Sequence, residues 1–267
     1  MKRIHLFEFM DLNWYPKVLR NIQTNILQVI MKTTKAFDHT IPYIQSIIES
    51  TGNKTIIDLC SGASGPWERI YKKLPDEHIN ILLSDKYPNI NIFQAIKKRS
   101  DNRIGYIGES IDVLSTEYSK DITYTIFTGF HHFRPNEIKM FLGDIQKNES
   151  SICIFDYVPN KLLIILLTPI TIIISFLQFY ILSFLVRPYT VQQLLFTNII
   201  PIVPIVSAWD GFVSGLRKYS KKELIKIIGT LKSKNYNWIV ENDTQLSKGT
   251  PLVYLLGYKN KENKAVI

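Results

Sequence analysis

Short apolar runs alternate with helix-like segments between Lys54 and Phe155, and this alternation constrains the fold more than any other feature. The apolar runs are continuous rather than interleaved with polar residues, which is typical of strands buried on both faces of a sheet. Between them, apolar residues recur at the spacing of amphipathic helices. We therefore predict an α/β fold with a doubly wound, mostly parallel sheet and helices on both faces. Strands are expected at residues 55–59, 79–83, 103–107, 122–127 and 151–155.

The two ends of the chain extend this pattern. Two helices are expected before residue 53, and a capping box formed by Ser220 and Glu223 predicts another helix towards the far end. Two further strands, at residues 236–240 and 252–258, bring the predicted sheet to seven strands.

An uncharged run of 25 residues, from Leu162 to Val186, follows the fifth strand, and a second uncharged stretch runs from Pro188 to Trp209. A helix of that first length would extend about 37 Å, enough to cross a bilayer core of about 30 Å. We expect a helical hairpin that dips into or lies on a membrane. The alternative is a pair of helices that cover a hydrophobic substrate pocket. The predicted parts of the chain are a helical cap (1–53), the α/β core (54–160), the hydrophobic insertion (161–210) and the rest of the core (211–267).

Charge and cysteine content limit the partners and the compartment. The 32 basic and 23 acidic residues give a net charge of +9, which favours an anionic membrane surface or nucleic acid. Because the basic residues are dispersed, we expect no nucleic-acid partner. Two cysteines, 93 positions apart, exclude a disulfide scaffold, and the first residues do not resemble a secretory signal. We expect a membrane-associated protein on the cytoplasmic side.

Small residues follow the first strand. The segment from Asp58 to Gly65 reads Asp-Leu-Cys-Ser-Gly-Ala-Ser-Gly, and Asp85 closes the second strand. Gly62 and Gly65 permit positive φ angles and a close approach of the backbone to a ligand. In open α/β sheets, ligands bind outside the carboxyl ends of the strands, where a carboxylate accepts hydrogen bonds from ribose hydroxyls. A plain turn before a helix is the alternative for the first motif alone, but together the two motifs favour a nucleotide-type site.

The same residues resemble the class I (Rossmann-like) S-adenosylmethionine (SAM)-dependent methyltransferases, whose first motif reads acidic-x-Gly-x-Gly-x-Gly. Cys60 and Ser64 stand here in place of the outer two glycines. The resemblance covers about residues 54–155 and 220–259, and it implies that the last two strands form an antiparallel pair. It also implies SAM as the cofactor.

Carried over by position, the resemblance implies a role for each of six residues. Asp58 would lie near the amino group of SAM, directly or through water, and Gly62 and Gly65 would line its methionine portion. Asp85 would accept from the ribose hydroxyls, and Asp112 from the adenine amine. Thr128, after the fourth strand, would border the reacting sulfonium.

Two adjacent histidines, His131 and His132, come next. A neutral imidazole there could take a proton from an attacking hydroxyl, amine or acid; alternatively, one histidine caps the next helix or packs under the loop. No third ligand is apparent nearby, so no metal site is expected. Asp156, closing the fifth strand, is either part of this site or a carboxylate facing water. Asp210 and Arg217 either line the substrate site or form an ion pair that seats the insertion.

The leading hypothesis is a SAM-dependent methyltransferase that acts at a membrane on an apolar or amphiphilic small molecule, perhaps derived from a lipid. One alternative is an RNA or protein methyltransferase, which the net charge suggests. The other is a non-catalytic, membrane-associated protein that uses the fold as a scaffold.

Overall fold

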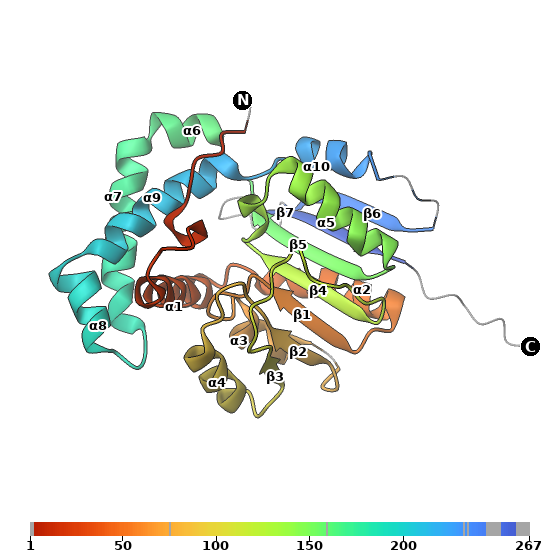
Figure 1. Cartoon of the computed structure of the whole chain (residues 1–267), viewed down its shortest axis with the longest axis horizontal. Helices are drawn as coiled ribbons and strands as arrows, with labels where there is room; N and C mark the ends of the chain where they lie inside the picture. The colour runs from red at the N-terminus through yellow and green to blue at the C-terminus, as the bar shows by residue number, and fades with distance from the viewer. Residues whose placement is uncertain are drawn as a thin grey trace, which may run out of the picture.

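The structure is a computed structural model that describes residues 3–74, 76–158, 160–231, 233, 235–243 and 252–259. Among these residues, seven strands form one sheet in the order β3-β2-β1-β4-β5-β7-β6 (Figure 1). The parallel strands are β1 (Thr55–Leu59), β2 (Asn80–Leu83), β3 (Ile104–Tyr106), β4 (Ile122–Phe127) and β5 (Ser151–Tyr157). The predicted doubly wound sheet is confirmed.

The last two strands form the antiparallel pair that the resemblance implied. β7 (Leu252–Tyr258) lies antiparallel to both its neighbours, β5 and β6 (Asn237–Asp243). The strand order reverses between β1 and β4, which lie side by side. A crevice therefore opens at the carboxyl ends of these strands, because the connections from β1 and β4 leave towards opposite faces.

Helices cover both faces of the sheet. On one face, α2 (Ile41–Thr51), α3 (Trp67–Ile70) and α4 (Ile90–Arg99) bury apolar side chains in one cluster with residues of the sheet; α2 contacts β5 and β7, and α4 contacts β3. On the other face, α5 (Pro135–Lys147) and α10 (Lys221–Ile228) pack against β4, β5 and β7. The predicted capping box of Ser220 and Glu223 opens α10. Burial of two apolar layers against one sheet accounts for the continuous apolarity of the strands.

The insertion packs beside the sheet as a separate group of helices, at the left in Figure 1. Its elements are α6 (Lys161–Leu166), α7 (Thr168–Leu182), α8 (Val191–Gln193) and α9 (Ile202–Arg217). The expected hairpin is present in the packing of α7 against α9, and the N-terminal helix α1 (Lys17–Thr34) contacts both. Helix α9 is continuous across the boundary predicted between residues 210 and 211.

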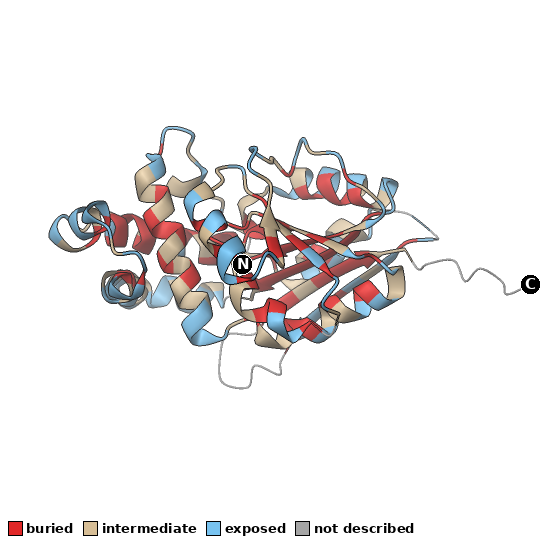
Figure 2. Ribbon diagram, turned by 90° about the horizontal axis from the view of Figure 1, so that it is seen from below, coloured by how far each residue is buried: buried red, intermediate tan, exposed pale blue. Residues whose placement is uncertain are grey.

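The insertion exposes much of its apolar surface. Within the described part of the chain, one helical stretch, Thr168–Leu185, is long and apolar enough to cross a membrane, and 11% of it is buried. The segments Val191–Ile199 and Ile202–Arg217 pass the same test only together, and they are bent by 67°. Figure 2 shows exposed residues along these helices, whereas the strands of the sheet are largely buried.

Candidate active site

A cavity of about 640 Å³ opens at the carboxyl ends of β1, β2, β4 and β5 and is closed on its other side by α1, α7 and α9. Seven of the eight predicted site residues line it: Gly62, Gly65, Asp85, Asp112, Thr128, His131 and His132. The eighth, Asp58, lies behind the loop that forms the cavity wall.

The loop after β1 keeps a glycine-like backbone although two glycines of the motif are replaced. Gly62 and Gly65 have φ angles of +56° and +50°, and Cys60 and Ser64, which stand for the outer glycines, have +56° and +98°. Residues with side chains adopt this region at a cost. Hydrogen bonds hold the turn, because the N–H groups of Ser64 and Gly65 both donate to the Ser61 carbonyl.

Asp58 supports this loop from below. Its Oδ1 accepts a hydrogen bond from Thr125 Oγ1 (2.6 Å) and its Oδ2 accepts one from Ser61 Oγ (2.6 Å). Burial raises the pKa of Asp58 to about 7. The carboxyl group therefore holds the loop and is not among the residues that line the cavity. Its implied place near the amino group of SAM, directly or through water, stays a prediction.

Asp85 and Asp112 lie on the wall beyond the loop. The Gly62 N–H donates to Asp85 Oδ2 (2.7 Å), and the Tyr87 N–H donates to Oδ1 (2.8 Å). Burial raises the pKa of Asp85 above its ordinary value. The carboxylate of Asp112 pairs with Lys86 at 2.8 Å, which lowers the pKa of Asp112 even though partial burial opposes this shift.

The turn after β4 is tight. Thr128 has a φ of +53°, unusual for a β-branched residue, and its N–H donates to the Phe155 carbonyl (2.9 Å). A Cβ placed on Gly129 would lie 2.9 Å from Cys60 Cβ, so the two turns touch. This close contact brings the end of β4 against the glycine-rich loop.

His131 forms a buried pair with Asp156. Its Nδ1 lies 2.8 Å from Asp156 Oδ2, and its Nε2 has no hydrogen-bond partner among the described residues. Burial lowers the pKa of His131, so its imidazole is neutral at pH 7. Asp156 is 5% exposed and belongs to the site rather than facing water.

His132 stacks on His131 with ring centroids 4.5 Å apart, but the charges around its ring are different. Burial acts to lower its pKa, but the nearby carboxylates of Glu8 and Asp11 raise the pKa of His132 to about 9. Asp11 Oδ1 lies 2.6 Å from His132 Nδ1. His132 is therefore charged at neutral pH and is not the neutral proton acceptor that was predicted.

The N-terminal segment, residues 3–12, was not predicted to be part of the site; it runs between the insertion and the sheet (Figure 1), and several of its residues line the cavity. The buried Arg217 guanidinium donates to Glu8 Oε1 (2.9 Å) and Asp11 Oδ2 (2.6 Å), not to Asp210. Asp210 instead accepts from the Phe9 N–H (2.7 Å). The hypothesis of an Asp210–Arg217 ion pair is therefore wrong. The sequence feature that could have indicated this segment is the pair Glu8 and Asp11, two acidic residues three positions apart among aromatic residues.

The expectation that no third metal-binding side chain lies near the histidines is also wrong. Donor atoms of Glu8, His131 and His132 lie within 4.8 Å of one another. The Arg217 guanidinium, however, already pairs with Glu8 at 2.9 Å and supplies the positive charge there. A metal ion at this place would lie beside that guanidinium, so the arrangement fits an ion pair better than a metal centre.

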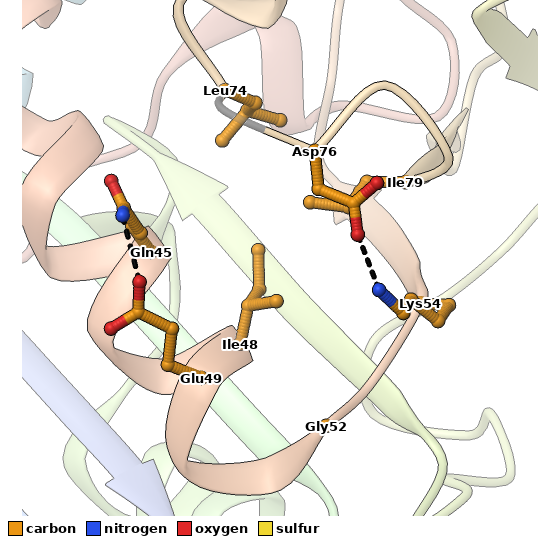
Figure 3. A pocket seen from close by; sticks show the side chains of 8 residues that line it. All are labelled: Gln45, Ile48, Glu49, Gly52, Lys54, Leu74, Asp76 and Ile79. Carbon is orange, nitrogen blue, oxygen red and sulfur yellow. Dashed lines mark hydrogen bonds and ion pairs between the residues drawn. The ribbon is translucent and has the colours of Figure 1, made fainter.

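A smaller hollow of about 240 Å³ lies at the opposite, amino-terminal edge of the sheet (Figure 3). Lys54, directly before β1, pairs there with Asp76, and Gln45 donates to Glu49 (2.7 Å). These polar groups are paired with each other, and the hollow lies away from the crevice.

No family model and no curated protein matches the sequence. Among solved structures, the pyocyanin biosynthetic protein PhzM matches with a TM-score of 0.50 and 11% identity, over 86% of this chain and 56% of PhzM. A putative O-methyltransferase from Nostoc punctiforme matches with a TM-score of 0.47 and 12% identity, over 86% and 59%. Human N-acetylserotonin methyltransferase, solved in complex with SAM, matches with a TM-score of 0.48 and 9% identity, over 90% and 56%.

The chain spans somewhat more than half the length of these structures. At such low identity, the match to PhzM establishes the fold alone. The Rossmann-like methyltransferase fold that the resemblance implied is therefore confirmed.

Proposed function

We propose that this protein is a SAM-dependent methyltransferase that methylates a hydroxyl group of an apolar or amphiphilic small molecule at a membrane surface. One observation carries the proposal. The glycine-rich loop with Asp85 and the neutral His131, whose Nε2 accepts or donates no hydrogen bond among the described residues and lies 3.9 Å from Glu8, meet in a single cavity.

The cavity wall suits a nucleoside with a charged methionine portion. Gly62 and Gly65 leave room for a ligand beside the loop, and the carboxylates of Asp85 and Asp112 would accept hydrogen bonds from the ribose and the adenine. SAM supplies an activated methyl group on a sulfonium. We call the wall formed by Gly62, Gly65, Asp85 and Asp112 the cradle. Thr128, directly after β4, lines the same cavity, as do the two histidines.

The His131–Asp156 pair favours an acceptor that loses a proton. A neutral imidazole takes that proton at Nε2, while Asp156 holds the other ring nitrogen and stabilises the imidazolium that forms. Hydroxyl groups need this assistance because their oxygen is a weak nucleophile when protonated. The buried surroundings also exclude water from the reaction. The walls of the cavity hold the two reactants in line.

Titration with SAM and with its demethylated product S-adenosylhomocysteine tests this proposal. We expect both to bind the full-length protein, and Asp85→Ala to weaken both by tenfold or more because the ribose loses its acceptor. Met140→Ala on the exposed face of α5 is the control. Lack of binding of either ligand at millimolar concentration would leave the non-catalytic scaffold as the better explanation.

A membrane is the partner that best suits the outer face of the insertion. Its exposed side chains form a large apolar surface; they include Leu162, Leu166, Ile170, Ile173, Ile174, Leu177, Ile181 and Leu185. Soluble monomers rarely expose contiguous apolar patches of more than a few hundred Å². The net charge of +9 adds attraction to anionic lipid.

Flotation with lipid vesicles tests this partner. We expect the protein to float with phosphatidylglycerol vesicles and the Ile173→Lys/Ile174→Lys variant to lose most of this binding. Met140→Lys, an equally exposed apolar position on α5, is expected to bind like the wild type. Equal flotation of both variants would contradict the assignment of the membrane face to the insertion.

A further inference from the structure

The cavity extends beyond the nucleoside cradle into the space between α1 and the insertion. Eight residues of α1 line it: Arg20, Gln23, Thr24, Leu27, Gln28, Ile30, Met31 and Thr34. The distance from Arg20 to Thr34 along a helix is about 21 Å. Because the lining follows α1 for most of its length, the cavity is elongated.

The composition of the walls changes along this length. Near the cradle, Thr24 contacts the position of Gly62, and Gln28 Nε2 donates to Ser64 Oγ (3.0 Å). On the side of the insertion, Leu27 and Ile30 of α1 face Phe179 of α7, with which they form an apolar cluster. Polar walls surround the cradle, whereas the extension combines this apolar cluster with polar side chains of α9, among them Ser207, Asp210 and Ser214.

A buried hydroxyl on α9 points to a ligand in this extension. Ser207 is 1% exposed and lines the cavity, and its Oγ has no hydrogen-bond partner among the described residues. An unpaired buried hydroxyl is unfavourable, so buried hydroxyl groups usually have a partner. A polar atom of a bound molecule would provide one here.

We propose that this extension is an acceptor channel for an elongated, mostly apolar molecule with a hydroxyl at its reacting end. The inference rests on the proposed function, because the reacting end lies beside His131. The hydrocarbon portion of the molecule lies against Leu27, Ile30 and Phe179, and a polar atom farther along the molecule pairs with the Ser207 hydroxyl. The outer side of the same helices is the exposed apolar surface, so a molecule dissolved in a membrane is close to the channel.

Binding of 4-ethylphenol, 4-hexylphenol and 4-nonylphenol to the full-length protein, measured by calorimetry, tests the channel. We expect one site per chain and an affinity that increases about fourfold for each added methylene, until the channel is filled. Equal affinities for the three phenols would overturn the proposal.

Two substitutions narrow the channel from opposite walls. Ser207→Phe on α9 and Ile30→Trp on α1 are each expected to remove the dependence on chain length, so either suffices if the other fails to fold. Thr197→Val is the matched control, since Thr197 is also buried with a hydroxyl that lacks a partner among the described residues, yet it does not line the cavity. A well-folded narrowed variant that keeps the chain-length dependence would refute the channel.

The binding of S-adenosylhomocysteine, measured on the same samples, separates this proposal from the proposed function. Chain-length dependence without nucleoside binding would support the channel and contradict methyl transfer. Nucleoside binding without chain-length dependence would contradict the channel and leave the proposed methyl transfer standing.

Discussion

Two adjacent histidines show how strongly the surroundings of a residue determine its chemistry. Burial lowers the pKa of His131, whose Nδ1 pairs with Asp156 and whose Nε2 lies 3.9 Å from Glu8. His132 lies near the same Glu8 and pairs at 2.6 Å with Asp11, and these carboxylates raise its pKa to about 9. The two side chains are identical and adjacent in the chain, so burial and the close carboxylate partner of each ring decide which of them can accept a proton.

Replacement of His131 by Gln is expected to lower kcat by about 10²- to 10⁴-fold, the usual contribution of a general base. Affinity for SAM is expected to stay within about threefold of the wild type, since His131 lies beyond the cradle. Because burial lowers the pKa of His131, wild-type activity is expected to decline only below the ordinary histidine pKa of about 6.5. Steady-state rates from pH 5 to 8 measure both effects, and a variant with near-normal kcat would refute the assignment.

Among the elements, the N-terminal segment joins the insertion to the turn that carries His131 and His132. Arg3 of this segment donates to the carbonyls of His131 and Phe133 (both 2.8 Å), and Glu8 pairs with Arg217 at the end of α9. Trp209 Nε1 also donates to the Phe7 carbonyl (3.1 Å). A short segment, whose regular structure is one 3₁₀ turn at Phe9–Asp11, therefore contacts both larger elements.

Arg217→Met is expected to destabilise the protein by about 3–5 kcal/mol, because Glu8 would remain buried without its partner. Adding Glu8→Gln is expected to recover part of this loss, since the unpaired charge is then removed. Urea denaturation of the two single variants and the double variant gives the coupling free energy. Additive effects would show that this ion pair does not hold the segment in place.

At the scale of the whole molecule, the charges that surround the site link stability to pH. The folded-state pKa of His132, about 9, is above the value of about 6.5 expected in the unfolded chain. Protonation of His132 therefore favours the folded state. This contribution is fully present below pH 6.5 and is lost as the pH rises through 9.

The prediction is tested by comparing wild type with His132→Asn in urea at pH 6, 8 and 10. The stability advantage of the wild type is expected to be greatest at pH 6 and to shrink by pH 10. The comparison cancels the other titrating groups, which are common to both proteins. A constant difference across this range would contradict the shifted pKa of His132.

The sheet, its flanking helices and the position of the cradle could be predicted from the order of residues alone. These features are local: apolar periodicity sets each element, and the residues after β1, β2 and β4 necessarily meet at the edge where parallel strands end. Gly62 and Gly65 adopt the expected positive φ angles. Cys60 and Ser64 adopt them too, and hydrogen bonds to Ser61 and the support of Asp58 hold this loop.

The charges that surround the histidines, in contrast, could not be predicted before the folded arrangement was known. Glu8 and Arg217 are separated by more than two hundred positions and come into contact only after α9 has returned from the insertion. The same folding places α1 between the cradle and the insertion, which creates the elongated cavity. Periodicity describes how a segment arranges its own residues, whereas the pKa of a buried group depends on every charge that other segments bring near it.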